Sequence, residues 1–388
     1  MDMTKKVRIL LYVLSFSVTC MVLVLLVKRG DFSNETGNQS TGVQMETEQD
    51  TILQETEDKI MQSQVESESE ETLRDDGVAT LVFAGDVLIA EAMEQYYDSE
   101  GVTRIVSKEL LKEMQDADIC MVNNEFQFSN RGTPMEDKKF TFQTNPKYVK
   151  ILTDMGVDIV SLANNHSIDF GLEALEDTFV TLDDAGILYA GAGRTKERAE
   201  ELQIIEADGQ KIGFLAATRV IPVAEWNVDI REPGLFATYD DTRLVASIKE
   251  AKEKCDFLVV YVHWGIEREA LPQEYQTVIA RHCIEAGADV IIGAHPHVLQ
   301  GIEFIKDKPV FYSLGNYVFA QSIAQTMLVK IEIQKTGEAA YSIIPAYAQG
   351  GMTKKFEGEE AETLFNYMNE ISTKNYVDAD GNVKQLHE

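Results

Sequence analysis

The sequence predicts an α/β fold in which buried strands alternate with amphipathic helices. The first observation is a series of short, continuous apolar runs, which are typical of strands covered on both faces. The second is that segments with helix start and stop signals separate most of these runs. The third is that polar and ionisable residues gather just after the runs, where open α/β sheets carry their functional sites.

The apolar runs are expected to form the strands of one domain. They are Ala79–Ala84, Ile119–Val122, Val157–Ala163, Ile212–Ala217, Asp256–Val262, Ala288–Ile292 and Pro309–Leu314. Two later segments, Met327–Ile333 and Tyr341–Tyr347, alternate more clearly between apolar and polar residues and predict an antiparallel pair. These segments supply the sheet framework of the predicted α/β domain.

The segments between the runs predict helices from their capping signals. Asn145 and Pro146 suit the N-cap and first helical position of a helix that ends near Met155. The other helices are expected at Leu172–Ala185, Asp240–Lys254, Gln273–Ala286 and Phe356–Thr373. Gly186 and Gly287 directly follow two of them, and glycine commonly ends a helix.

The residues before this domain predict a membrane anchor. After a short cytoplasmic end at 1–8, segment 9–27 is uncharged and long enough for a membrane-spanning helix of about 20 residues. Lys28 and Arg29 stand where a signal peptide would carry small residues for cleavage, so we expect the anchor to stay uncleaved. The N-terminal end is short and the following segment is acidic. We therefore expect a single-pass plasma-membrane protein whose C-terminal domain is extracellular.

Segment 28–76 is rich in acidic and small polar residues, which predicts a disordered, extended stalk. The whole chain has a net charge of −30, from 65 acidic and 35 basic residues. Such a charge argues against nucleic acid as a partner, because nucleic-acid binding rewards Lys and Arg. An anionic substrate would need a local positive site, for which a bound metal ion is the expected source. We assign the globular domain to 77–375 and a tail to 376–388.

Polar motifs follow the C-terminal ends of the apolar runs. They are Gly85-Asp86, Asn123-Asn124-Glu125, Asn164-Asn165-His166 with Asp169, His263-Trp264-Gly265 with Glu267, His295-Pro296-His297, and Ser313-Leu314-Gly315-Asn316. Four of the chain's six histidines stand in these motifs, which structural histidines alone explain poorly. Carboxylate, amide and imidazole groups without cysteine suit Mn, Fe or Zn. An anion-binding centre built from imidazoles is the alternative.

The motifs also indicate roles around the metal ligands. Asn165 and His166 are adjacent, so one turn can offer an amide ligand and a general acid. Asp169 is expected to orient His166 as the second catalytic residue, or to cap the next helix. We place three further residues around the ligands, as substrate contacts or supporting hydrogen-bond partners: Asn124, Glu267 and Asn316.

The order of these motifs resembles that of CapA-type proteins of poly-γ-glutamate capsule synthesis. The matching segments are GDVLIA, NNEF, LANNHSIDFG, HWGIE, GAHPHVLQ and YSLGNYVF, which together span about 81–319. The predicted anchored topology also resembles that family. CapA domains are in turn similar to calcineurin-like metallophosphoesterases, which implies a two-sheet sandwich flanked by helices.

The resemblance implies a role for each motif residue. The implied ligands of one or two divalent ions are Asp86, Glu125, Asn165, His263, His295 and His297. His166 is implied to be the acid. Glu125 takes the place of a bridging aspartate, and Leu88 takes that of a histidine ligand in the wider pattern. CapA relatives often carry a basic residue soon after the Gly-Asp motif, and this chain has none there.

These observations lead to one main hypothesis and two alternatives. The main hypothesis is a membrane-anchored, metal-dependent, metallophosphoesterase-like hydrolase that acts in synthesis, export or trimming of an anionic cell-surface polymer such as poly-γ-glutamate. Its expected partners are the polymer or its precursors, and membrane-bound polymer synthase subunits. The first alternative is a non-catalytic protein that binds the polymer or scaffolds a capsule synthesis complex. The second is a metallophosphoesterase with an unrelated phosphoester substrate.

Overall fold

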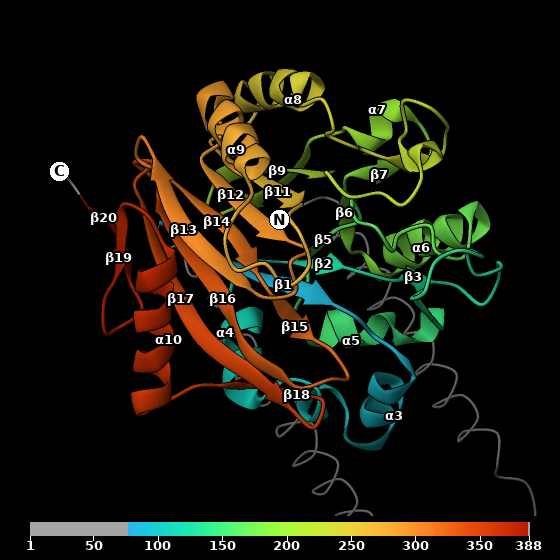
Figure 1. Cartoon of the computed structure of the whole chain (residues 1–388), viewed down its shortest axis with the longest axis horizontal. Helices are drawn as coiled ribbons and strands as arrows, with labels where there is room; N and C mark the ends of the chain where they lie inside the picture. The colour runs from blue at the N-terminus through green and yellow to red at the C-terminus, as the bar shows by residue number, and fades with distance from the viewer. Residues whose placement is uncertain (1–76, 387–388) are drawn as a thin grey trace, which may run out of the picture. The chain divides into compact units, whose positions relative to one another are not determined.

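The α/β class is confirmed by the computed structural model, in which helices cover two mixed β-sheets (Figure 1). The structure describes residues 77–386, so the predicted cytoplasmic end, membrane anchor and stalk lie outside the described residues. Among residues 77–386, no helix combines the length and the apolar character needed to cross a membrane.

The first sheet contains eight strands. In spatial order they are β18 (Met352–Lys355), β17 (Ala339–Gln349), β16 (Ile323–Gln334), β1 (Val78–Val87), β2 (Ile119–Asn124), β5 (Ile159–Ser161) and β6 (Leu188–Ala190), with β15 (Asn316–Val318) also paired to β1. Strands β1, β2, β5 and β6 are parallel. Strands β16 and β17 form the predicted antiparallel pair, which is confirmed.

The second sheet contains six strands. In spatial order they are β13 (Leu299–Ile305), β14 (Lys308–Leu314), β12 (Val290–Ala294), β11 (Phe257–His263), β9 (Gln210–Thr218) and β8 (Gln203–Ala207). The four central strands are parallel, and the two outer strands pair with them in antiparallel fashion. Each predicted apolar run therefore forms a strand of one sheet or the other.

Helices cover the outer face of each sheet. Those packed on the first sheet are α3 (Glu91–Glu100), α4 (Lys108–Gln115), α5 (Val149–Asp154) and α6 (Leu172–Ala185), and those on the second are α8 (Thr242–Lys252) and α9 (Glu274–Ala286). The short α7 (Lys196–Ala199) and the closing helix α10 (Gly358–Ile371) complete the set (Figure 1). Helices α3 and α4 were not predicted; α3 buries only Met93, so its apolar pattern is weak.

Both faces of the central strands are buried, as the continuous apolar runs predicted. On β1, Leu81 and Phe83 pack between the two sheets, whereas Val82 and Ala84 pack toward the helices of the first sheet. Successive side chains of a strand point to opposite faces, so an apolar residue at every position fits a layer covered on both sides. Cys120, Cys255 and Cys283 are free thiols that are buried in the domain.

The end of the chain is folded onto this sandwich. Residues predicted to form a tail include most of a hairpin made by β19 (Asn375–Val377) and β20 (Val383–Gln385). Val377 and Val383 are buried in the core between the sheets, and Asn382 pairs with Ser342 of β17. The residues up to Leu386 are therefore part of the domain, because the hairpin contributes apolar side chains to its core.

Gly85 allows β1 to lie against the turn that precedes β15. A Cβ atom at this position would stand 1.9 Å from the main-chain oxygen of Gly315. The next residue, Asp86, donates its main-chain N–H to that same oxygen at 3.0 Å. Glycine is therefore required at residue 85, and the close approach holds Asp86 beside Asn316.

We predict that Gly85→Ala lowers the free energy of unfolding by about 3 kcal/mol or more, because the added atom overlaps main chain that cannot rotate away. Urea denaturation followed by circular dichroism measures the change. Gly337→Ala is the control, since its added Cβ meets nothing within 4 Å and only its left-handed backbone costs energy, about 1–2 kcal/mol. Equal losses in the two variants would contradict this account of Gly85.

Candidate metal centre

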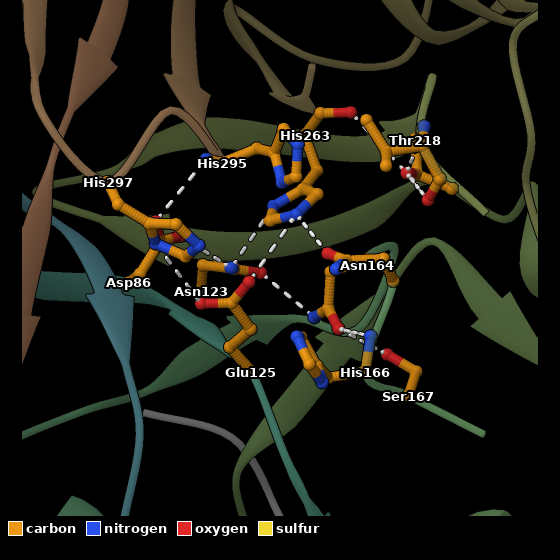
Figure 2. Close-up of polar contacts among 12 residues, drawn as sticks. Asp86, Asn123, Glu125, Asn164, His166, Ser167, Thr218, His263, His295 and His297 are labelled. Carbon is orange, nitrogen blue, oxygen red and sulfur yellow. Dashed lines mark hydrogen bonds and ion pairs between the residues drawn. The ribbon is translucent and has the colours of Figure 1, made fainter. Parts of the chain in front are cut away.

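Carboxylates and imidazoles from both sheets meet where the parallel strands end (Figure 2). Asp86 lies near the end of β1, and Glu125 directly follows β2. His263 is the last residue of β11, while His295 and His297 follow β12. Because the carboxyl ends of both sheets lie at this edge, residues far apart in the sequence come into one cluster.

The cluster divides into two groups that share one carboxylate. Glu125, His263 and His295 form the first group, which we call triad A. Asp86, Glu125 and His297 form the second, triad B. Within each triad the three candidate ligand atoms lie within 4.8 Å of one another, a spacing that can hold a metal ion.

Glu125 directs a different oxygen toward each triad. Its Oε1 lies 3.6 Å from Nε2 of His263, and its Oε2 lies 3.9 Å from Nδ1 of His297. The residue is 1% exposed, and neither oxygen accepts a hydrogen bond from any residue in 77–386. A buried carboxylate left in this state costs free energy unless a cation compensates its charge.

Burial also controls the protonation of this cluster. Burial, with the nearby Asp86 carboxylate, raises the pKa of Glu125 well above its ordinary value. Burial and the neighbouring histidines lower the pKa of His263 well below its ordinary value, and that of His295 to about 4. These two imidazoles are therefore neutral at physiological pH, the form that binds metal ions.

His297 differs from the other two histidines. Burial lowers its pKa, but Glu125, Asp86 and Asn316 outweigh that effect and raise it to about 10. Its Nδ1 lies 3.2 Å from Oδ2 of Asp86 and 2.7 Å from Oδ1 of Asn316. A proton on Nδ1 of His297 therefore lies next to the side-chain oxygens of Asp86 and Asn316.

The motif that carries two of these histidines has a strained backbone. His295 has φ of 98° and His297 has φ of 60°, both in the left-handed region that side chains with a Cβ rarely adopt. The nitrogen Nδ1 of His295 is buried and has no hydrogen-bond partner among the described residues. Strain that persists in a packed structure is common at binding and catalytic sites.

His166 and Asp169 lie together beside the triads. Nδ1 of His166 is 2.7 Å from Oδ2 of Asp169, and the imidazole is buried. Burial lowers the pKa of His166, and Asp169 partly opposes this. Lys138 donates hydrogen bonds to Oδ1 of Asp169 and to the main-chain oxygen of Asn165. The structure thus places the two predicted catalytic residues in direct contact and adds a lysine to them.

The remaining predicted site residues take different positions. Asn165 directs its Oδ1 to within 2.7 Å of Nε2 of His263, next to triad A. Asn316 contacts His297 of triad B. Asn124 instead donates to the main-chain oxygen of Phe126, although its own Oδ1 is buried without a partner in the described chain. Glu267 is exposed, outside both triads but close enough to raise the pKa of Glu125.

Three further residues support the centre without having been assigned a role from the sequence. Asn123 donates to Oδ1 of Asp86 at 2.8 Å and contacts Nδ1 of His263 at 3.3 Å. Asn164 donates to Oδ1 of Asn123 at 3.0 Å. Both asparagines stand inside the motifs, so their position was a usable signal. Lys138 comes from the loop between β3 (Gln127–Phe128) and β4 (Gln143–Thr144), where no motif marks it.

The donor set fits a pair of divalent ions. Triad A with Asn165 offers one carboxylate oxygen, two imidazole nitrogens and one amide oxygen. Triad B offers two carboxylates and one imidazole. Imidazole and oxygen ligands suit Mn, Fe or Zn, and a shared carboxylate can bridge two ions about 3.5–4 Å apart.

Fold and site together define an α/β protein with a candidate metal centre at the common edge of its two sheets. It belongs to the family described as "Bacterial capsule synthesis protein PGA_cap", whose model matches residues 80–321. This confirms the resemblance to CapA-type proteins.

Curated relatives are similar over most of the domain. The PGA biosynthesis protein CapA of Bacillus subtilis (strain 168) is 31% identical over 279 residues, which cover 70% of this chain and 72% of the relative. The capsule biosynthesis protein CapA of Bacillus anthracis is 28% identical over 291 residues, or 72% and 70% of the two chains. A crystal structure of a hypothetical protein from Thermus thermophilus aligns over 69% of this chain and 98% of its own, with 18% identity and a TM-score of 0.44.

We predict that Glu125→Gln stabilises the metal-free protein and removes its stabilisation by divalent ions. Glutamine keeps the shape of the side chain but removes a buried charge that costs about 1–3 kcal/mol when unpartnered. Because the pKa of Glu125 is raised in the folded state, the metal-free parent loses stability as pH rises above the ordinary carboxyl pKa of 4.5. The variant should lack this part of the pH dependence.

Thermal unfolding across pH, with and without Mn²⁺, measures both effects. At a free-ion concentration about 100-fold above its dissociation constant, the parent should gain about 2.7 kcal/mol. A variant that gains as much from Mn²⁺ as the parent would exclude Glu125 as a metal ligand.

Proposed function

We propose that this protein is a membrane-anchored, metal-dependent hydrolase of the CapA type. It acts in the synthesis, export or trimming of an anionic cell-surface polymer such as poly-γ-glutamate. Family membership and the names of the two Bacillus relatives support the capsule role. The observation that carries the metal-dependent chemistry is Glu125, whose two oxygens accept no hydrogen bond within residues 77–386 and face the other members of the two triads.

The residues of the centre have distinct tasks in this proposal. Triads A and B would hold the ions, with Glu125 common to both. Ions bound there would supply Lewis acidity toward the scissile group and lower the pKa of water. Once His297 gives up its proton to an ion, the imidazoles and the amide of Asn165 would all be neutral, and Asp86 and Glu125 would carry the only negative charges of the ligand set. The two divalent ions together would then keep an excess of positive charge that can attract an anionic substrate, despite the chain's net charge of −30.

His166 is the general acid in this proposal. Asp169 holds Nδ1 of the imidazole at 2.7 Å, which leaves Nε2 as the atom that can pass a proton to a leaving group. Lys138 donates to Asp169 and so fixes the carboxylate that orients the ring. The ring of Phe142 packs against that of His166, with the two ring centroids 4.6 Å apart.

A non-catalytic, polymer-binding version of the protein is the second candidate. The observation that favours it is Leu88, which is buried in the apolar core where the wider phosphoesterase pattern carries a histidine ligand. Triad B consequently has one ligand fewer than that pattern. Incubation of the metal-loaded protein with γ-glutamyl polymer and with a panel of phosphoesters distinguishes the candidates. Cleavage of the polymer supports the proposed hydrolase, cleavage of phosphoesters alone favours an unrelated phosphoesterase, and no cleavage favours the scaffold.

We predict that His166→Ala slows turnover by about 10²–10⁴-fold and leaves metal content unchanged, because the imidazole donates a proton but holds no ion. His263→Ala should lower both activity and metal content, since this residue belongs to triad A. Elemental analysis and initial rates on the same preparations measure the two effects. His282→Ala is the matched control, because His282 is exposed on α9 and pairs with Asp241. Full activity in His166→Ala would remove the acid role.

The proposed location is the outer face of the plasma membrane. It is supported by the uncharged segment 9–27 and by the absence of a cleavage signal at Lys28 and Arg29. We predict that protease added to intact cells cuts within 30–76 and releases the domain as a soluble fragment, because an acidic, polar segment offers little packing to resist cleavage. Immunoblotting detects the fragment, and a cytoplasmic protein serves as the control. Protection of the chain in intact cells would overturn this location.

A further inference from the structure

Each triad has an asparagine oxygen placed against one of its histidines. In triad A, Oδ1 of Asn165 lies 2.7 Å from Nε2 of His263. In triad B, Oδ1 of Asn316 lies 2.7 Å from Nδ1 of His297. Of these two asparagines, the family resemblance implies a ligand role only for Asn165. The two contacts nevertheless have the same length, and each joins an amide oxygen to an imidazole nitrogen.

The backbone holds Asn316 at this place. Strand β15 runs parallel to β1, with Asn316 directly opposite Asp86 in the register. The preceding residue, Gly315, accepts the main-chain N–H of Asp86 at 3.0 Å. The side chains of Asn316 and Asp86 are therefore presented to the same nitrogen of His297 by adjoining strands.

Three oxygen atoms surround that nitrogen. Nδ1 of His297 lies 2.7 Å from the amide oxygen of Asn316, 3.2 Å from Oδ2 of Asp86 and 3.9 Å from Oε2 of Glu125. A single N–H can point well at only one of them. Two ligands of one ion, each bound at about 2.1 Å, lie about 3.0 Å apart at a right angle and about 3.4 Å apart at the tetrahedral angle. The 3.2 Å distance lies within this range and the 2.7 Å distance lies just below it, so one cation can satisfy the converging acceptors after a small shift of Asn316.

We propose that the amide oxygen of Asn316 is the fourth protein ligand of the ion held by Asp86, Glu125 and His297. This inference rests on the metal-dependent function proposed above. Asn316 then supplies the ligand that the wider pattern takes from a histidine at the position of Leu88. Both ions would have one amide oxygen each, from Asn165 and Asn316, and Glu125 in common.

Metal titration of purified full-length protein tests the assignment. The parent should bind two Mn²⁺ ions, and Asn316→Ala should weaken one of them by about 100-fold or more while the other is unchanged. Asn316→Asp restores an oxygen ligand and should keep both ions. Asn165→Ala should weaken the ion of triad A instead. Asn130→Ala, which changes an exposed asparagine outside both ligand sets, is the control.

A crystal structure of the Mn²⁺-loaded parent separates a ligand from a residue that only orients His297. As a ligand, Oδ1 of Asn316 stands within about 2.3 Å of the ion, near the bond length usual for oxygen ligands. A distance beyond about 3 Å, or unchanged binding of both ions in Asn316→Ala, overturns this inference alone. A parent that cannot be loaded with any divalent ion overturns the metal-dependent function together with it.

Discussion

The carboxylate of Glu125 is buried at the point where the two sheets meet and belongs to both triads, so the rest of the centre is arranged around it. It accepts no hydrogen bond from the described residues, so its stabilisation depends on positive charge placed nearby. Without an ion, His297 carries that charge, and its pKa of about 10 reflects the contact with Glu125 and Asp86. An ion held by triad B would replace the proton on Nδ1 of His297, so ion binding would release a proton.

Neutral asparagine side chains support this arrangement from behind the ionisable groups. Asn123 donates to one oxygen of Asp86 and also contacts His263, so it links a residue of triad B to a residue of triad A. Asn164 holds Asn123 in turn. A chain of amides can do this because each has a donor and an acceptor and neither carries a charge. Side chains with a net charge at these positions would alter the electrostatic balance around Glu125.

The strands, and the gathering of the candidate ligands at one edge, could be predicted from the sequence, because parallel strands covered on both faces give continuous apolar runs and their carboxyl ends share one edge. The contact of Asn316 with His297 could not, since it depends on β15 returning beside β1. Lys138 lies in a loop without a periodic pattern, so no local signal marks it. Helix α3 and the hairpin from Asn375 bury few side chains, and their patterns are weak. The anchor and the extracellular location stay predictions.

The candidate ligands come from both layers of the sandwich: Asp86 and Glu125 from the first sheet, His263 and His295 from the second. Ions bound between these residues would link the two sheets directly. By thermodynamic reciprocity, a mutation that loosens the core between the sheets would weaken ion binding, and loss of the ions would loosen the sheets. A cell deprived of the metal would then hold fewer intact copies of the protein as well as less active ones, because opened chains are removed by proteases.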